Sequence, residues 1–373
     1  KFTVVRTMKL VKMAEDGSNF KLWVSAAMDV NVYDTWSPKR VYDYVKETCG
    51  PTPPTANIYE QTEELHQCMM SGWEIACNWQ SAAIHEIVKR EGIELVMSHM
   101  HIDDLVDHTF IHNLSKLVAD GSYAHGMTEV THEDYKRWQE ELYVVTDQYL
   151  GSFLHYLDEG WTIIVTSDHA LICPEHDHQE MGSNESLNVG VMERLGYTVR
   201  KVDENGNPYD EIDWEKTRAI QCRANSIYVN LKGRDRHGIV DPADKYELEE
   251  QIITDLYGYK DPKTGKRIVA LALHNKDAVL LGITGELAGD IVFMLHEGYN
   301  FDHGESLSTA CGHNDTSVSP IFVAAGPGVK SGYTVKNYIR EVDVAPTVSV
   351  LLGCEIPAEC EGAPAYEIFT ERV

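Results

Sequence analysis

Residues 131–169 have the sequence THEDYKRWQEELYVVTDQYLGSFLHYLDEGWTIIVTSDH, and this stretch decides the expected fold. Over residues 132–158, apolar and aromatic side chains recur every three or four positions, which predicts an amphipathic helix. Thr131 and Asp134 have the spacing of a capping box at its start. The nearly continuous apolar run at residues 161–166 then predicts a buried strand.

A second apolar run, at residues 93–99, precedes this helix and predicts another buried strand. Strand, helix and strand in this order form a βαβ unit, which requires a parallel sheet. Further along, residues 321–325 predict a strand, and residues 342–352 predict a helix that Gly353 ends. The expected fold is therefore an α/β sandwich with a central, mostly parallel sheet flanked by helices.

The first part of the chain shows different sequence patterns. Residues 1–6 and 20–30 predict two strands of a hairpin, because the turn residues 15–18 lie between them. Four prolines at residues 35–57 favour an irregular segment, and a helix is expected over residues 73–91.

The middle of the chain is predicted to be an insertion. Short mixed segments and turns at residues 188–290 indicate an inserted α+β subdomain that would contribute to the substrate site, with residues 1–187 and 291–373 forming the core. We recognise no aromatic or basic signature in the insertion that would identify a substrate.

Composition excludes several classes of protein. The 373 residues contain 32 Lys and Arg against 59 Asp and Glu, a net charge of −27, which disfavours binding to nucleic-acid polymers or anionic membranes. No apolar run approaches the roughly 18 residues of a membrane span. The 8 cysteines are scattered without a CxxC pair, so we expect mostly buried free thiols, and the compartment stays open.

Three polar clusters follow or precede predicted strands, where α/β folds place their sites. Asp104 and His108 are four apart and would share one helix face, although such a pair is also common on solvated faces, and Asp103 and Asp107 compete for the role. Asp168 and His169 directly follow the strand at 161–166, where a helix N-cap is an equal alternative. His313 precedes the strand at 321–325 and would be an ordinary loop histidine if it stood alone.

Together, these clusters carry a resemblance to a known family. The pattern DxxxH at 104–108, SDH at 167–169 after a strand, and GHND at 312–315 before a strand that ends in GPG resembles the alkaline phosphatase superfamily, in its type I phosphodiesterase/nucleotide pyrophosphatase branch. The segments GPGVKSG at 326–332 and DVAPT at 343–347 match it too. The resemblance covers roughly residues 93–365 and implies an alkaline-phosphatase-like fold.

The resemblance also implies a binuclear metal site, occupied by zinc or by manganese. Asp104, His108 and His313 would bind one ion, and Asp168 and His169 would bind the other. His303 is a rival to His313.

The activity that this family implies is hydrolysis of phosphodiester, pyrophosphate or phosphomonoester bonds in a small phosphorylated substrate, by in-line attack at the metal pair. The family's Thr or Ser nucleophile has no convincing copy here: Thr55, with Asp16 or Asp29 as the upstream carboxylate, is the nearest imitation. We expect the nucleophile in sequence before Lys1 or in a companion chain. The alternatives are a phosphomutase, or a catalytically silent fragment or subunit, and oligomer formation stays open.

The positions of the remaining histidines indicate supporting roles. His99, His101 and His112 flank the DxxxH cluster, and we expect them to pack against the ligands or to hydrogen-bond with them. The histidine-rich loop at 175–178 is more typical of solvated surface than of a further site.

Overall fold

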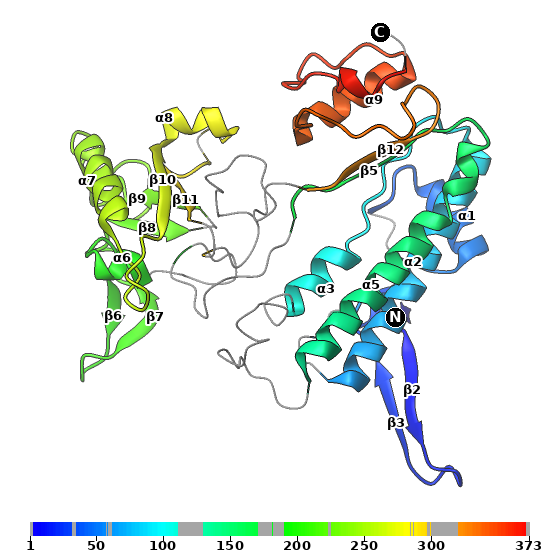
Figure 1. Ribbon diagram of the computed structural model, residues 1–373. Coiled ribbons are helices and arrows are strands. Elements are labelled where there is room, and N and C mark those ends of the chain that lie inside the picture. The colour runs from blue at the N-terminus through cyan, green and yellow to red at the C-terminus, as the bar shows by residue number, and fades with distance from the viewer. Residues whose placement is uncertain are drawn as a thin grey trace.

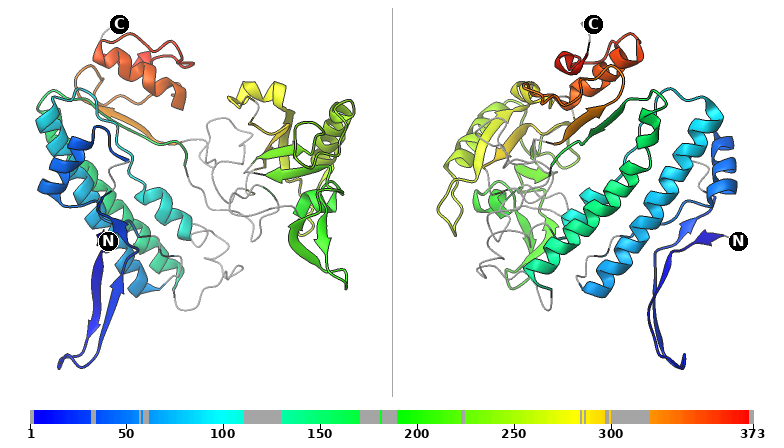
Figure 2. Two further views of the ribbon diagram at one scale, coloured as in Figure 1. Left: turned by 180° about the vertical axis from the view of Figure 1, so that it is seen from behind. Right: turned by 45° about the vertical axis from the view of Figure 1, so that its right-hand side comes forward.

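In a computed structural model of the chain, helices and small antiparallel sheets form two groups of elements (Figure 1). The structure describes residues 3–31, 35–56, 58, 62–110, 130–170, 181, 190–222, 225–283, 285, 287–296, 299 and 320–370, without the side chains of residues 108–110. Figures 1 and 2 show the elements between residues 190 and 296 gathered apart from the long helices.

The first described elements form a projecting β-hairpin. β2 (Met8–Met13) pairs antiparallel with β3 (Phe20–Val24), and β1 (Val4–Val5) pairs with β4 (Met28–Asp29). In the turn, Asp16 accepts hydrogen bonds from the backbone N–H and the hydroxyl of Ser18 at 3.0 and 2.6 Å. The predicted hairpin turn is confirmed, but the strand that pairs across it is Met8–Met13, and the predicted strand at residues 1–6 contributes only the short pair of β1 with β4.

In the described residues 35–157, four α-helices follow the hairpin, and the two longest run side by side in both views of Figure 2. They are α1 (Lys39–Cys49), α2 (Glu63–Glu91), α3 (Ile102–Phe110) and α5 (His132–Gly151), which the 3-10 helix η3 (Leu154–Leu157) extends. The capping box is confirmed: the Asp134 N–H donates to Thr131 Oγ1 at 3.2 Å, and the Thr131 N–H donates to Asp134 Oδ2 at 2.9 Å.

The core between these helices is aromatic. Trp138 on α5 is 2% exposed, stacks on the His66 ring with centroids 4.3 Å apart, and donates through Nε1 to Glu63 at 3.0 Å. Ile102 and Val106 bury the inner face of α3 in the same cluster. This packing fixes the orientation of α3, on which Asp107 is buried and Asp103 and Asp104 are only partly exposed.

The predicted central parallel sheet is wrong. β5 (Ile163–Thr166) pairs antiparallel with β12 (Phe322–Ala325) in a two-stranded sheet, and every sheet in the described residues is antiparallel. The predicted strands at 161–166 and 321–325 do form. However, a short apolar run indicates that a strand is buried without indicating the direction of its partner.

Two further expectations are wrong. Residues 93–101 form no regular element, and Leu95 and Met97 are 55% and 97% exposed, so this run is not a buried strand. An apolar run becomes a strand only where a neighbouring edge pairs with it. The expectation of irregular chain over residues 35–57 is wrong at α1, because Pro38 precedes the helix as its N-cap, where a proline removes no helical hydrogen bond. It is met over residues 50–56, which form no regular element.

The second group of elements surrounds a four-stranded sheet in the order β10-β11-β9-β8, next to the hairpin β6–β7. Its elements are α6 (Gly190–Arg194), β6 (Arg200–Val202), β7 (Pro208–Ile212), β8 (Ala219–Cys222), β9 (Ser226–Val229), α7 (Lys245–Gly258), β10 (Val269–His274), α8 (Asn275–Ala278), η4 (Val279–Leu281) and β11 (Ile291–Leu295). A continuous hydrophobic core, which includes Ile252 and Phe293 with no exposed surface, joins α7 to the sheet.

The C-terminal described segment covers the β5–β12 pair in Figure 1. It contains η5 (Glu341–Asp343), α9 (Val344–Leu352) and η6 (Tyr366–Ile368). Gly353 ends α9 in the left-handed conformation at φ 67°, as its position in the sequence predicts.

Within the described ranges, no helix combines the length and the apolar character that a membrane span requires. Six cysteines are free thiols, of which Cys68 and Cys77 are buried and Cys222 and Cys354 are exposed. The expectation of buried thiols is therefore met at some positions and wrong at others, while Cys173 and Cys311 lie outside the described residues.

Candidate functional site

Two of the predicted ligands come together at the start of α3. Asp104 Oδ1 lies 3.2 Å from Nε2 of His169, and Asp104 Oδ2 lies 2.6 Å from Nε2 of His101. The side chains of Asp104 and His169 are 19% and 16% exposed, so the contact is sheltered but open to solvent. One carboxylate therefore faces two imidazoles that come from different segments of the chain.

The local chain holds His169 beside the end of β5. The Ser167 hydroxyl donates to the His169 carbonyl at 2.7 Å, which bends the chain after the strand. Nδ1 of His169 lies 3.3 Å from the Ala170 carbonyl, which can only accept a hydrogen bond. A proton on Nδ1 leaves Nε2, on the Asp104 side, as the nitrogen that can share a proton with the carboxylate or bind a cation.

Two more carboxylates lie on the same helix. Asp103 Oδ1 accepts a hydrogen bond from the Thr146 hydroxyl at 2.8 Å. Asp107 is 5% exposed, and burial together with the neighbouring charge of Asp103 raises its pKa to about 7. The α3 face thus concentrates negative charge in a partly desolvated place, which favours a proton or a cation there. The sequence contains no signal for the role of Thr146, since the pattern of α5 indicates only its apolar face.

The donor types fit a divalent transition metal, since carboxylate and imidazole are ordinary zinc and manganese ligands. Ligand atoms about 2.0–2.2 Å from a tetrahedral ion lie roughly 3.3–3.5 Å from one another. The separation of 3.2 Å between Asp104 Oδ1 and His169 Nε2 is close to that spacing. Among the residues that the structure describes, however, no group of three or more His, Cys, Asp or Glu side chains is arranged to hold a metal ion. Asp104 and His169 therefore amount to part of a site.

The other predicted ligands are distributed as follows. His108 follows Asp104 by one turn of α3, as predicted for a shared face, but its side chain is outside the described set. Asp168 is exposed beside His169. His303, His313, His112 and the loop at 175–178 lie outside the described residues.

The candidates for the nucleophile and its upstream carboxylate lie elsewhere in the chain. Thr55 is exposed in the segment between α1 and α2. Asp16 is bound within the hairpin turn, and Asp29 accepts a hydrogen bond from the Asn31 N–H at 2.9 Å. Each of these carboxylates thus has a local structural role.

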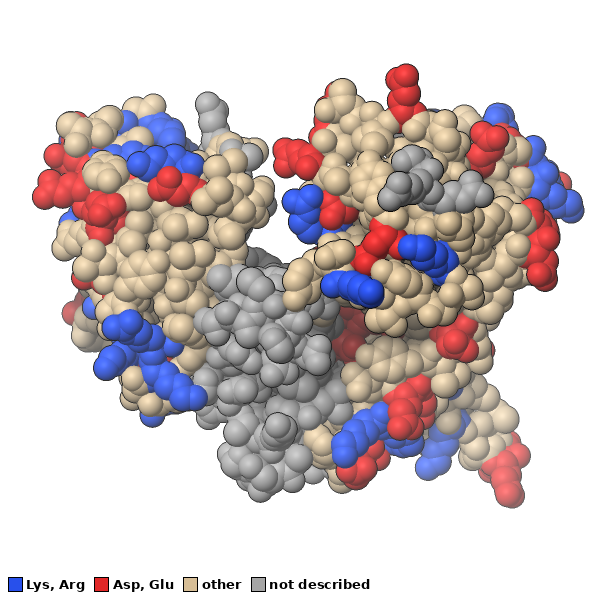
Figure 3. Space-filling model, turned by 45° about the horizontal axis from the view of Figure 1, so that its top comes forward, with Lys and Arg blue, Asp and Glu red and all other residues tan. Residues whose placement is uncertain are grey.

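Positive and negative side chains are mixed on the surface of the molecule. Figure 3 shows acidic and basic side chains interspersed over the face that it presents, despite the net charge of −27.

Comparisons with models of protein families, with curated proteins and with solved structures found no match to this chain.

Proposed function

We propose that the chain is a metal-dependent phosphohydrolase whose metal site is built on Asp104 and His169. The observation that supports this function is their contact of 3.2 Å, because it brings together two motifs from distant parts of the sequence that the resemblance assigns to one binuclear site. The parallel sheet that the resemblance implies is not part of the proposal, since the sheets are antiparallel.

Each residue has a distinct part in this site. Asp104 and His169 would hold one ion together, rather than one ion each as the resemblance implies, because their ligand atoms lie 3.2 Å apart. His101 would keep the Asp104 carboxylate oriented through the contact at Oδ2. Asp103 and Asp107 would add negative charge near the ion, and this charge favours the binding of a cation. His108, Asp168 and His313 are the proposed remaining ligands. A bound zinc or manganese ion supplies Lewis-acid stabilisation of charge on phosphoryl oxygens.

The proposed substrates are small phosphate esters: a phosphodiester, a pyrophosphate or a phosphomonoester. The acidic surface would not hinder them at a metal site, because the positive charge of the ions acts over the few ångströms where salt screens weakly. Bis(p-nitrophenyl) phosphate and p-nitrophenyl phosphate report diesterase and monoesterase activity separately.

The metal content of the purified chain tests the site directly. Elemental mass spectrometry should find zinc or manganese in the parent protein and a loss of that metal in Asp104→Asn and in His169→Gln. Asp147→Asn is a matched control, since Asp147 is an exposed carboxylate on α5, and it should retain the metal. His101→Ala should weaken metal affinity about 10- to 100-fold, as is typical for a residue that orients a ligand.

Activity provides the second measurement. Phosphate release that EDTA abolishes, and that zinc or manganese restores, would support the hydrolase. Bound metal without release of phosphate or nitrophenol would favour the catalytically silent subunit. A parent protein without divalent metal, or variants at Asp104 and His169 that bind metal like the parent, would refute the proposed site.

A further inference from the structure

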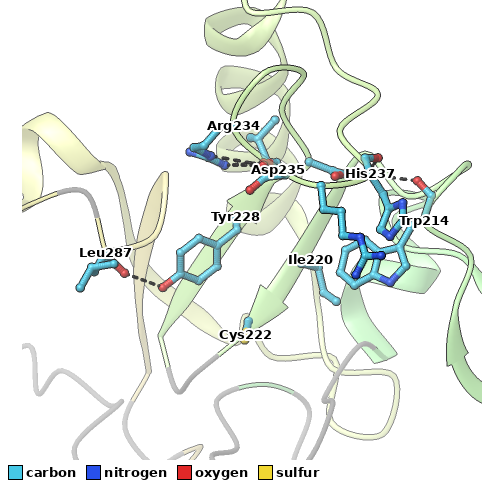
Figure 4. A pocket seen from close by; sticks show the side chains of 11 residues that line it. Trp214, Ile220, Cys222, Tyr228, Arg234, Asp235, His237 and Leu287 are labelled. Carbon is cyan, nitrogen blue, oxygen red and sulfur yellow. Dashed lines mark hydrogen bonds and ion pairs between the residues drawn. The ribbon is translucent and has the colours of Figure 1, made fainter.

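A cavity of about 630 Å³ lies on the second group of elements, over strands β8 and β9 (Figure 4). Its volume is within the range of about 300–1,000 Å³ that is usual for small-molecule sites. Neither Asp104 nor His169 lines it. The cavity is thus separate from the candidate metal site.

One wall of this cavity is flat and apolar. Ile220 and Tyr228 are cross-strand neighbours on β8 and β9, and the Tyr228 hydroxyl donates to the Leu287 carbonyl at 2.9 Å, which fixes the phenol ring. Trp214, from the chain after β7, lines the cavity with 39% of its surface exposed. Two aromatic rings therefore face a space that is large enough for a planar ligand.

The loops that form the other wall are held in place by a buried amide. Asn230 is 4% exposed, and its Nδ2 donates to the carbonyls of Trp214, Thr217 and His237 at 3.1, 2.9 and 3.0 Å. Trp214 and His237 consequently lie at the same end of the cavity, as Figure 4 shows. Because these bonds join the loops to one another within the protein, binding would not have to order the loops.

Among the described residues that line the cavity, one positively charged side chain has no partner of opposite charge. Arg234 contacts the two Asp290 carboxylate oxygens at 2.7 and 2.9 Å and Asp235 at 3.1 Å, so its charge is matched. Arg236 and His237 also line the cavity and are exposed. Within the described part of the chain, neither side chain forms a hydrogen bond or an ion pair. The cavity thus offers a guanidinium and an imidazole to an anion.

We infer that this cavity binds a planar organic anion: an aromatic ring that carries a single carboxylate, sulfonate or phosphate group. The ring would stack on Trp214 against the Tyr228 side, and the anionic group would pair with Arg236. Both parts are needed, since an exposed guanidinium alone binds anions weakly and an apolar wall alone does not select charge.

The probe is 2-naphthalenesulfonate, which is planar, singly charged and resistant to hydrolysis. Ligand-observed NMR on the full chain, with EDTA present to prevent metal binding, should give a dissociation constant on the order of 1 mM or tighter. Trp214→Ala and Arg236→Gln should each weaken binding about tenfold. Sulfate and 2-naphthalenemethanol, which each lack one part of the ligand, should bind about tenfold more weakly.

Matched controls come from the same group of elements. Tyr209 is an exposed aromatic residue on β7, Arg267 is an exposed arginine before β10, and neither lines the cavity. Tyr209→Ala and Arg267→Gln should bind the probe like the parent. Absence of saturable binding to the parent, or equal binding by Trp214→Ala, Arg236→Gln and both controls, would overturn the inference. Asp104→Asn should bind the probe like the parent, so the outcome is distinguishable from failure of the metal site.

Discussion

Replacement of Asn230 by aspartate tests whether a single buried amide holds the loops after β7 and β9 together. The substitution keeps the shape of the side chain and exchanges a donor for an acceptor. In the parent, Asn230 Nδ2 donates to three carbonyls at 2.9–3.1 Å. In Asn230→Asp, a carboxylate oxygen would face three carbonyl oxygens, none of which can donate a hydrogen bond.

The expected magnitudes follow from the burial of these bonds. The bond to the Thr217 carbonyl is buried, and its loss should cost about 2 kcal/mol; the two partly buried bonds should add about 0.5 kcal/mol each. Asn230→Ala should therefore lower the free energy of unfolding by about 3 kcal/mol. At pH 8, Asn230→Asp should lower it by about 5 kcal/mol, because a buried charge adds to the lost bonds.

The pH dependence of the aspartate variant has a definite sign. Carbonyl oxygens and burial would raise the folded-state pKa of the new carboxyl above its unfolded value of about 3.9. The loss of stability that comes from ionising the buried carboxyl is then absent below the unfolded-state pKa, and it grows as the pH rises toward the folded-state pKa. The excess cost of aspartate over alanine should thus be smaller at pH 5 than at pH 8.

Urea denaturation followed by circular dichroism at both pH values measures these differences. Asn19→Asp, at an exposed position just before β3, is the control, and it should change stability by no more than about 0.5 kcal/mol. If Asn230→Asp lowers the free energy of unfolding at pH 8 by no more than Asn230→Ala does, Asn230 does not hold the loops as described. The same conclusion follows if both variants unfold like the parent.

Two further predictions concern the helical group. Thr131→Ala removes the capping box with Asp134 and should lower the free energy of unfolding, measured by urea denaturation, by about 1 kcal/mol. Thr131→Ser keeps the hydroxyl oxygen and should lower it much less. Equal losses in the two variants would contradict the capping role. Burial raises the pKa of Cys77 to about 11, so about one thousandth of it is thiolate at pH 8. Iodoacetamide at that pH should modify exposed Cys354 long before Cys77, as peptide mass spectrometry can show, and equally fast labelling would be incompatible with the packing of α2.

Local signals in the sequence predicted several elements well. The capping box at Thr131 and the apolar periodicity after it indicated α5, and Gly353 marked the end of α9. The turn at Asp16 marked the hairpin. These signals succeeded because the interactions that they describe are formed by residues close to one another in the chain.

The errors arise where a distant partner decides the structure. The run at residues 93–99 has the composition of a buried strand, yet Met97 is 97% exposed, and no strand in the described part of the chain pairs with this run. The run that forms β5 pairs antiparallel with β12, far along the sequence, and its composition is the same for either direction of pairing. No window of sequence around either run contains that information.

The candidate sites divide in the same way. The sequence by itself determined the kinds of side chain available, carboxylates and imidazoles at residues 104–108 and 168–169, and the helical spacing of the first pair. Only the tertiary structure brought Asp104 to 3.2 Å from His169, and only it joined Trp214, Tyr228 and Arg236 around one cavity. Chain-local geometry sets the first kind of information, whereas packing between distant segments sets the second, because burial and pairing depend on surfaces that the local sequence does not contain.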